Sequence, residues 1–239
     1  MCLKARYPEL ALRLPARLQE DPSLIVVRQM SPSVSLDDLR TVDDPLTAAR
    51  PRGVHVLELD SDLDDPAFQR FRLRFGHTVN KWFTQGRGPT ARGDLMSRAL
   101  EEMVDNVLLH ASIGRPGVVG YEVSTKGVVF GVFDLGVGAS ASLNRNPANG
   151  TIGDDRVALA KLIEPGVTGS PDGLGGNGYG NVFEALADAN GMVWLRSGTA
   201  VAELTGVDIQ PDVLKLTQSR AGSPDRHVGG FQVVIGCRQ

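Results

Sequence analysis

We expect an α+β fold, a β-sheet with helices on one face, because helical patterns and hairpin-connected strands succeed one another along this chain. Of the 239 residues, 41% are hydrophobic and 22% are charged, close to the averages for globular domains. The length fits one domain, or one domain with a sizeable extension. No run of about 18 uninterrupted apolar residues occurs, so the sequence predicts no membrane-spanning helix.

Charge and cysteine content argue against several classes of protein. The formal net charge is −3, whereas proteins built to coat nucleic acid usually carry a strong basic excess. Cys2 and Cys237 form no C-x-x-C pair and no zinc-ligand spacing with the four scattered histidines. The first residues interleave charges with apolar side chains and do not resemble a secretory signal, so we expect a cytoplasmic protein with reduced thiols.

The N-terminal part of the chain carries the weakest patterns. A helix is expected near Glu9–Glu20, a short buried strand at Leu24–Val27, and a loop or linker over Ser31–Gly53. A second strand is expected at Val54–Leu59.

An amphipathic helix is expected from Asp65 onward, because apolar residues recur at positions i, i+3, i+7, i+11 and i+14. Basic residues alternate with aromatic ones in this segment, a pattern that also occurs in single-strand nucleic-acid binding. Since the apolar side chains share one face, we interpret them as core and the arginines as a solvated face. The apolar stripe consists of Phe68, Phe71, Phe75, Val79 and Trp82.

The remaining elements follow in a regular order. A helix is expected at Asp94–Ala111 with its first residue as N-cap, and then a hairpin of the strands Gly117–Thr125 and Val128–Leu135. A helix at Asp154–Ile163 leads into a glycine-rich loop, Pro165–Gly180. The rest of the chain is expected to form the helix Asn181–Ala189 and the strands Met192–Arg196, Thr199–Leu204, Val213–Thr217 and Phe231–Ile235.

A first motif lies on the helix that begins at Asp94. Glu102, Asn106 and His110 are successive i+4 steps, so they form a polar stripe beside the apolar one. A carboxylate and an amide one turn apart can hold a hard cation: the amide oxygen ligates Mg²⁺, and the carboxylate orients or deprotonates a water. Because this spacing is common by chance, the motif alone also fits a solvated helix edge.

A second motif, Asp134 followed by Gly136 and Gly138, lies where a strand ends and a tight loop begins. An acidic side chain there can accept a hydrogen bond from an exocyclic amine such as that of adenine. The glycines let the backbone approach a flat ring because no Cβ is in the way. The same residues also fit an ordinary glycine-rich turn with a solvated carboxylate.

A third motif is the glycine cluster over 173–180, in which five of eight residues are glycine. Average glycine usage would give about 0.6. The cluster directly precedes a predicted helix, whose free backbone N–H groups can bind phosphate. It lacks the G-K-[ST] ending of a Walker loop and does not fit the dinucleotide fingerprint. The alternative is a flexible surface loop.

In this order and spacing, the three motifs resemble the N, G1 and G2 boxes of the GHKL ATPase superfamily, which includes histidine kinases, anti-sigma-factor kinases and DNA gyrase. The resemblance runs from Asp94 to the C-terminus and includes Gly229–Ile235, which is similar to the family's last core strand. It implies a Bergerat-type two-layer sandwich, a mixed sheet with helices on one face, that binds ATP and Mg²⁺ between its layers. We therefore divide the chain into an N-terminal extension or small accessory domain for interaction, residues 1–90, and an ATP-binding domain, residues 91–239.

The resemblance also implies a role for each matching residue. Asn106 would ligate Mg²⁺, and Glu102 would be the general base. Asp134 would accept a hydrogen bond from the adenine amino group, and Gly136 and Gly138 would shape the adenine pocket. His110 would be structural. A lid, residues 165–179, would close over the triphosphate together with Gly180, and the cofactor-binding residues of this region would be Gly176, Gly178, Tyr179 and Gly180.

Three positions depart from the family pattern. Leu109 stands where sensor kinases usually place a phosphate-binding Lys or Arg, which favours the anti-sigma-kinase type. Asn181 replaces the usual Leu after the last glycine, and Phe231 stands where a Thr normally supports the contacts to adenine. No phosphoacceptor box of the H-E-x-x-x-P kind is present, so the chain is not a complete sensor kinase.

The leading hypothesis is an ATP-binding regulatory protein that hydrolyses ATP, or transfers its γ-phosphate to a hydroxyl of an unidentified partner protein, with Mg²⁺. The alternative is an ATP-gated interaction module with negligible catalysis, in which residues 1–90 bind a partner or pair two protomers into a homodimer. Nucleic-acid processing is disfavoured because the chain is acidic and has no second domain that would supply a phosphate-sensing lysine.

Overall fold

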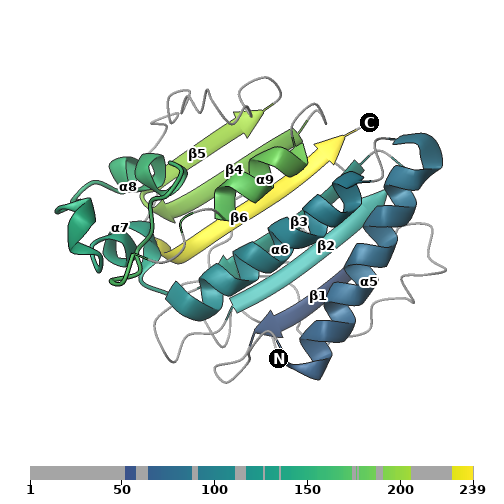
Figure 1. The fold of residues 1–239 in the computed structure, drawn as a ribbon, viewed down its shortest axis with the longest axis horizontal. Helices are drawn as coiled ribbons and strands as arrows, with labels where there is room; N and C mark the ends of the chain where they lie inside the picture. The colour runs from purple at the N-terminus through teal and green to yellow at the C-terminus, as the bar shows by residue number, and fades with distance from the viewer. Residues whose placement is uncertain are drawn as a thin grey trace.

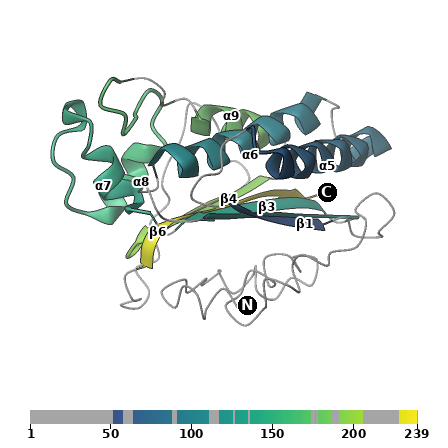
Figure 2. The same cartoon turned by 90° about the horizontal axis from the view of Figure 1, so that it is seen from below.

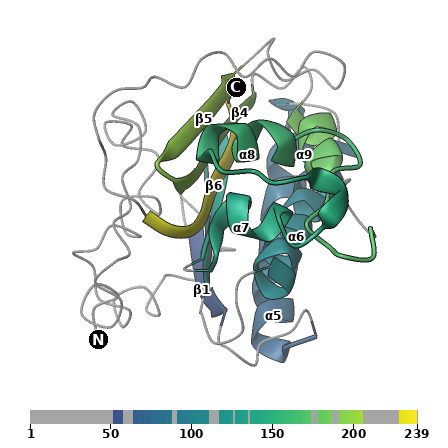
Figure 3. The ribbon, with the colours of Figure 1, turned by 90° about the vertical axis from the view of Figure 1, so that its left-hand side faces the viewer.

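The computed structural model describes residues 52–57, 64–87, 91–110, 117–125, 127–134, 136–173, 176, 178–186, 191–205 and 228–238. The expected elements Glu9–Glu20, Leu24–Val27 and Val213–Thr217 lie outside these residues. Within them, a six-stranded sheet has the order β1-β2-β3-β6-β4-β5. The helices α5, α6 and α9 lie side by side on one face of this sheet, and α7 and α8 lie beyond one end of it (Figures 1, 2 and 3). This two-layer arrangement is compatible with the expected α+β class.

All described strand pairs are antiparallel. The prediction of a mixed sheet is therefore wrong for these strands. The reason is the position of β6: β3 and β4 run in the same direction, but β6 lies between them and is antiparallel to both. The strands are β1 Arg52–Leu57, β2 Gly117–Ser124, β3 Gly127–Asp134, β4 Gly191–Gly198, β5 Ala200–Thr205 and β6 Val228–Arg238.

The helices agree with the predicted order but not with every boundary. Among the described residues they are α5 Pro66–Trp82, α6 Ala91–His110, α7 Gly138–Leu143, α8 Asp155–Leu162 and α9 Gly178–Leu186. A π-helical turn, Phe83–Arg87, follows α5, and a 3-10 turn, Pro147–Asn149, follows α7. Sequence reasoning did not predict α7.

The predicted apolar stripe of α5 is confirmed, since all five of its residues are buried. Phe75 packs edge-on against Phe130 of β3 at 5.6 Å between ring centroids, and Phe71 packs edge-on against Tyr121 of β2 at 5.3 Å. The Trp82 indole N–H donates a hydrogen bond to a β2 carbonyl. As predicted, Arg70 and Arg74 are exposed. Burial of aromatic side chains of this size contributes about 2 kcal/mol or more each, so the stripe fixes α5 on the sheet.

The residues before position 91 that the structure describes belong to the same sheet and core as those after it. β1 pairs with β2 along its whole length, from Arg52 opposite Glu122 to Leu57 opposite Gly117. α5 packs on β1 and β2 through the apolar stripe. The boundary that we placed at residue 90 therefore falls inside this core.

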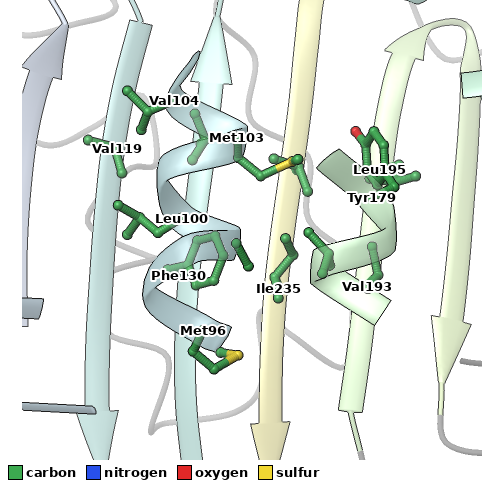
Figure 4. Close-up of a cluster of buried hydrophobic side chains, with 14 of the residues drawn as sticks. Met96, Leu100, Met103, Val104, Val119, Phe130, Tyr179, Val193, Leu195 and Ile235 are labelled. Carbon is green, nitrogen blue, oxygen red and sulfur yellow. The ribbon is translucent and has the colours of Figure 1, made fainter. Parts of the chain in front are cut away.

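Helix α6 lies across the centre of the sheet and buries Met96, Leu100 and Met103 (Figure 4). Val107, one turn further on, is also buried. It begins at Ala91, so the prediction of Asp94 as N-cap is wrong, and this carboxylate lies in the first turn. The physical reason is the contact between α6 and α5: a Cβ at Gly93 would collide with Asn80, so glycine lets the first turn pack closely on α5. The Asn80 side-chain amide donates a 3.0 Å hydrogen bond to Asp94.

Candidate functional site

A cavity of about 520 Å³ lies between α6, the end of β3, α7 and the start of α9. Pockets that bind small molecules and cofactors usually measure about 300–1,000 Å³. Gly136 and Gly180 are described but do not line it. The predicted site residues that do line it come from all three motifs: Glu102, Asn106, Asp134, Gly138, Gly176, Gly178 and Tyr179.

The polar stripe of α6 forms one wall of this cavity. Glu102 and Asn106 are half-buried and one helical turn apart, and the first residue of α9 lies directly over them. A Cβ built at Gly178 would be 3.1 Å from Glu102 Oε2 and 3.6 Å from the Asn106 amide nitrogen. Glycine thus allows the backbone of α9 to approach both polar groups. The side chain of His110, the third residue of the stripe, lies outside the described part.

Asp134 ends β3 and is 5% exposed. Its Oδ1 accepts hydrogen bonds from the backbone N–H of Gly136 at 2.6 Å and from that of Phe231 at 3.2 Å. Burial raises the pKa of Asp134 to about 6, although the two hydrogen bonds act in the opposite direction. Within the described residues no hydrogen bond reaches Oδ2, so this oxygen remains available to a ligand in the cavity. Gly136 thus supports the carboxylate instead of lining the cavity.

Gly138 begins α7 beside Asp134 and has a φ of +78°, a conformation that favours glycine. A Cβ there would lie 2.8 Å from Ser197 Oγ, which accepts a hydrogen bond from the Ala139 N–H. Ser197 Oγ–H in turn donates to the Gly230 carbonyl at 3.3 Å. Ser197 therefore joins the start of α7 to β4 and β6, and the missing Cβ of Gly138 leaves room for it. The sequence Gly-Ala-Ser-Ala-Ser-Leu has no helical apolar periodicity, which is why α7 was missed.

The lid segment is anchored at its N-terminal half. The Thr168 carbonyl accepts hydrogen bonds from the side-chain amides of Asn146 at 3.2 Å and Asn149 at 2.9 Å. The Gly166 N–H donates to the Gly176 carbonyl at 3.0 Å, which closes the segment into a loop. Sequence reasoning missed both asparagines, because nothing in a run of Asn and Pro identifies a carbonyl some 20 residues away as its partner.

Helix α9 begins at Gly178, three residues earlier than predicted, so the end of the glycine cluster is helical. Tyr179 is 7% exposed and lies near Phe183, with 6.1 Å between ring centroids. Burial, and secondarily the negative charge of Asp134, raise the pKa of the Tyr179 phenol, so the phenol stays protonated. Gly180 is exposed, and a Cβ there would touch nothing within 4 Å.

The charged side chains of the cavity wall are mostly acidic. Glu102, Asp105, Asp134 and Asp172 line it, and among the described lining residues Arg145 is the one basic side chain. No group of three or more His, Cys, Asp and Glu residues suited to a metal occurs in the described ranges. Mg²⁺ needs fewer protein ligands, since one or two side-chain oxygens together with substrate phosphates usually hold it. The amide of Asn106 beside the Glu102 carboxylate fits this kind of binding.

Two of the three departures from the family pattern lie at the cavity. Leu109 lines its rim and is 64% exposed, so no cation of α6 reaches the mouth at this position. Phe231 contributes apolar wall and, through its backbone N–H, the second hydrogen bond to Asp134. The Asn181 side chain lies outside the described part.

No protein-family model matches the chain, and no curated protein matches its sequence. None of the helices in the described ranges combines the length and the apolar character needed to span a bilayer.

Proposed function

We propose that this chain is a cytoplasmic ATP-binding regulatory protein with a Bergerat-type fold similar to that of the GHKL ATPases. It uses Mg²⁺ and either hydrolyses ATP or transfers the γ-phosphate to a hydroxyl of a partner protein. One observation carries the proposal: three motifs far apart in the sequence, represented by Asn106, Asp134 and Gly178, line a single cavity of about 520 Å³. Neither composition nor helix periodicity requires these segments to meet.

The adenine ring fits the part of the cavity next to Asp134. A flat purine needs apolar walls and a hydrogen-bond acceptor for its exocyclic amine, and the buried carboxylate offers Oδ2 as that acceptor. The walls beside it are supplied by Val132, Ala139, Phe231 and Val233. This placement supports adenine over guanine, whose O6 would meet the carboxylate with like partial charge.

The phosphates fit the opposite part, under the start of α9. Gly176 and Gly178 expose backbone there, and the positive end of a helix dipole favours anions. Asn106 would hold Mg²⁺, which when bound neutralises charge on the phosphates. Glu102 accepts the proton of the attacking water or hydroxyl while the new bond to the γ-phosphorus forms and the bond to the ADP oxygen breaks.

Calorimetry with ATP, ADP and GTP, each with and without Mg²⁺, tests this function. We expect binding of ATP, weaker binding of GTP, and a marked loss of ATP affinity in Asp134→Asn. Absence of nucleotide binding to the purified wild-type chain would exclude the proposal.

Turnover isolates the role of Glu102. We expect Glu102→Gln to retain ATP binding and to lose about 10²–10⁴-fold in phosphate release or transfer. The matched control is Glu101→Gln, since Glu101 is the adjacent residue, pairs with Arg72 at 2.8 Å and does not line the cavity. Equal turnover in wild type and Glu102→Gln would exclude the catalytic role.

An ATP-gated interaction module is the second candidate, favoured by Leu109. An apolar side chain that is 64% exposed at the rim of the cavity suits a contact with another protein better than a contact with phosphate. This function predicts tight ATP binding without phosphate release, together with an ATP-dependent change in oligomeric state measured by analytical ultracentrifugation.

A further inference from the structure

The charge balance of the cavity is unfavourable for a phosphate ligand. Four carboxylate side chains line it and would repel an anion, although exposed charges are partly screened. Arg145 is the one basic side chain among its described lining residues. Any ion pair between a described lining side chain and a phosphate therefore has to involve Arg145.

The backbone around Arg145 is held on both sides. Its N–H donates to the Ser142 carbonyl at 3.2 Å, and the next N–H, that of Asn146, donates to the Leu143 carbonyl at 3.2 Å. The Asn146 side chain caps the following 3-10 turn through the Ala148 N–H at 3.0 Å and also reaches the lid. The Cα of Arg145 therefore has a fixed position relative to the lid and the cavity.

The guanidinium of Arg145 is, in contrast, exposed and forms no hydrogen bond or ion pair within the described part of the chain. An arginine after a helix often interacts with the last carbonyls of that helix. Here the carbonyls of Ser140 and Ser142 already accept backbone N–H groups, so α7 does not need the guanidinium. An unpaired cation on a fixed backbone at the wall of an acidic cavity is available to an anionic ligand.

We propose that Arg145 binds a phosphate group of the nucleotide and supplies the cation that Leu109 does not. This inference rests on the proposed function, because it places the phosphates in this cavity. A guanidinium can donate two parallel N–H···O bonds to one phosphate, which gives direction as well as charge. Arg145 lines the same cavity as the lid residues Val167–Asp172, and the adjacent Asn146 donates a hydrogen bond to the lid carbonyl of Thr168, so a phosphate held by Arg145 would lie beside the lid.

Binding of adenosine, AMP, ADP and ATP to the wild type, Arg145→Gln and Arg145→Lys tests the inference by calorimetry. We expect Arg145→Gln to weaken the binding of phosphate-bearing ligands about 10- to 100-fold and to leave adenosine binding unchanged. Each ligand from adenosine to ATP carries one more phosphate than the one before. The first ligand whose affinity falls in Arg145→Gln therefore identifies the phosphate that Arg145 binds. Arg145→Lys should restore part of the affinity, since it keeps the charge but not the paired donors.

Arg156→Gln is the matched control. Arg156 is also an exposed arginine, pairs with Asp154 at 3.0 Å and does not line the cavity, so its loss should leave every affinity unchanged. If Arg145→Gln binds ATP as tightly as the wild type does, or loses adenosine and ATP equally, the inference is wrong while the proposed function stands. If the wild type binds no nucleotide, both are wrong.

Discussion

The carboxylate of Asp134, at the end of β3, accepts a hydrogen bond from the backbone N–H of Phe231 in β6, with 3.2 Å between nitrogen and oxygen. The two residues are 97 positions apart in sequence. Among the described residues that line the cavity, Asp134 carries the only buried carboxylate. The contact therefore connects β6 to the residue that we expect to accept a hydrogen bond from adenine.

Ionisation of Asp134 should make folding stability depend on pH. The pKa of this carboxyl is about 6 in the folded protein, against an ordinary value of 3.8. Because the folded pKa is the higher one, the contribution of this group to stability is fully present below about pH 3.8 and is lost as pH rises through about 6. The whole effect corresponds to about 3 kcal/mol of unfolding free energy.

Replacing Asp134 with Asn should abolish the fall in stability that accompanies ionisation. The amide oxygen can still accept the two backbone hydrogen bonds, but the side chain carries no charge. We expect Asp134→Asn to be more stable than the wild type at pH 8 by up to about 3 kcal/mol, and the difference to disappear near pH 4. Urea unfolding at pH 4, 6 and 8 measures it. Asp172→Asn, at an exposed position of the same cavity, is the control. A difference between wild type and Asp134→Asn that is constant from pH 4 to 8 would contradict the prediction.

Gly230 should be intolerant of any side chain. Its φ is +82°, and a Cβ there would collide with the carbonyl oxygen of Asp134. We expect Gly230→Ala to destabilise the protein by about 2–4 kcal/mol, since a strained backbone and a backbone clash add together. Gly150→Ala separates these causes: Gly150 has a similar φ, +68°, but nothing lies within 4 Å of its Cβ position. Thermal unfolding of the two variants should show the larger loss for Gly230→Ala, and equal losses would argue against the clash.

Sequence patterns predicted those parts of the protein that local periodicity specifies. The stripe from Phe68 to Trp82 has one apolar face and could be read directly, as could the hairpin of β2 and β3. The gathering of Glu102 and Asp134 at one cavity was predicted through the order of three motifs, each of which was ambiguous alone.

Long-range contacts account for most of what the sequence did not predict. From the sequence, Gly230 is expected to be an ordinary residue of the last strand. Its contact with the backbone of Asp134 is visible only in the folded structure. Asn149 and Thr168 are polar loop residues whose pairing depends on how α7 and the lid pack. The antiparallel sheet follows from the insertion of β6 between β3 and β4, which no local pattern encodes.

The hydrogen bonds of Asn149 should hold the lid against the 3-10 turn. Its amide donates to the carbonyls of Leu143 at 2.8 Å and Thr168 at 2.9 Å. Asn149→Ala leaves both acceptors without this donor, so we expect a loss of about 1–2 kcal/mol in stability and faster protease cleavage within the lid. Ser170→Ala, which removes an exposed bond to Asp172, should change cleavage little. Mass spectrometry of the fragments locates the cuts, and unchanged lid cleavage in Asn149→Ala would show that the anchor is not needed.

The two glycines at the start of α9 should respond in opposite ways to alanine. At Gly178 a Cβ would lie 3.1 Å from Glu102 Oε2, so in Gly178→Ala the Glu102 carboxylate or α9 has to shift by a few tenths of an ångström, which should narrow the cavity and weaken ATP binding about tenfold. At Gly180 a Cβ meets nothing within 4 Å, and alanine favours the helix by about 0.5–1 kcal/mol. Gly180→Ala should therefore be at least as stable as the wild type and bind ATP equally well. Calorimetry and thermal unfolding of both variants measure this contrast. Loss of ATP affinity in Gly180→Ala alone would contradict this prediction. It would mean that Gly180 contacts the nucleotide, as the resemblance implies, although it does not line the cavity.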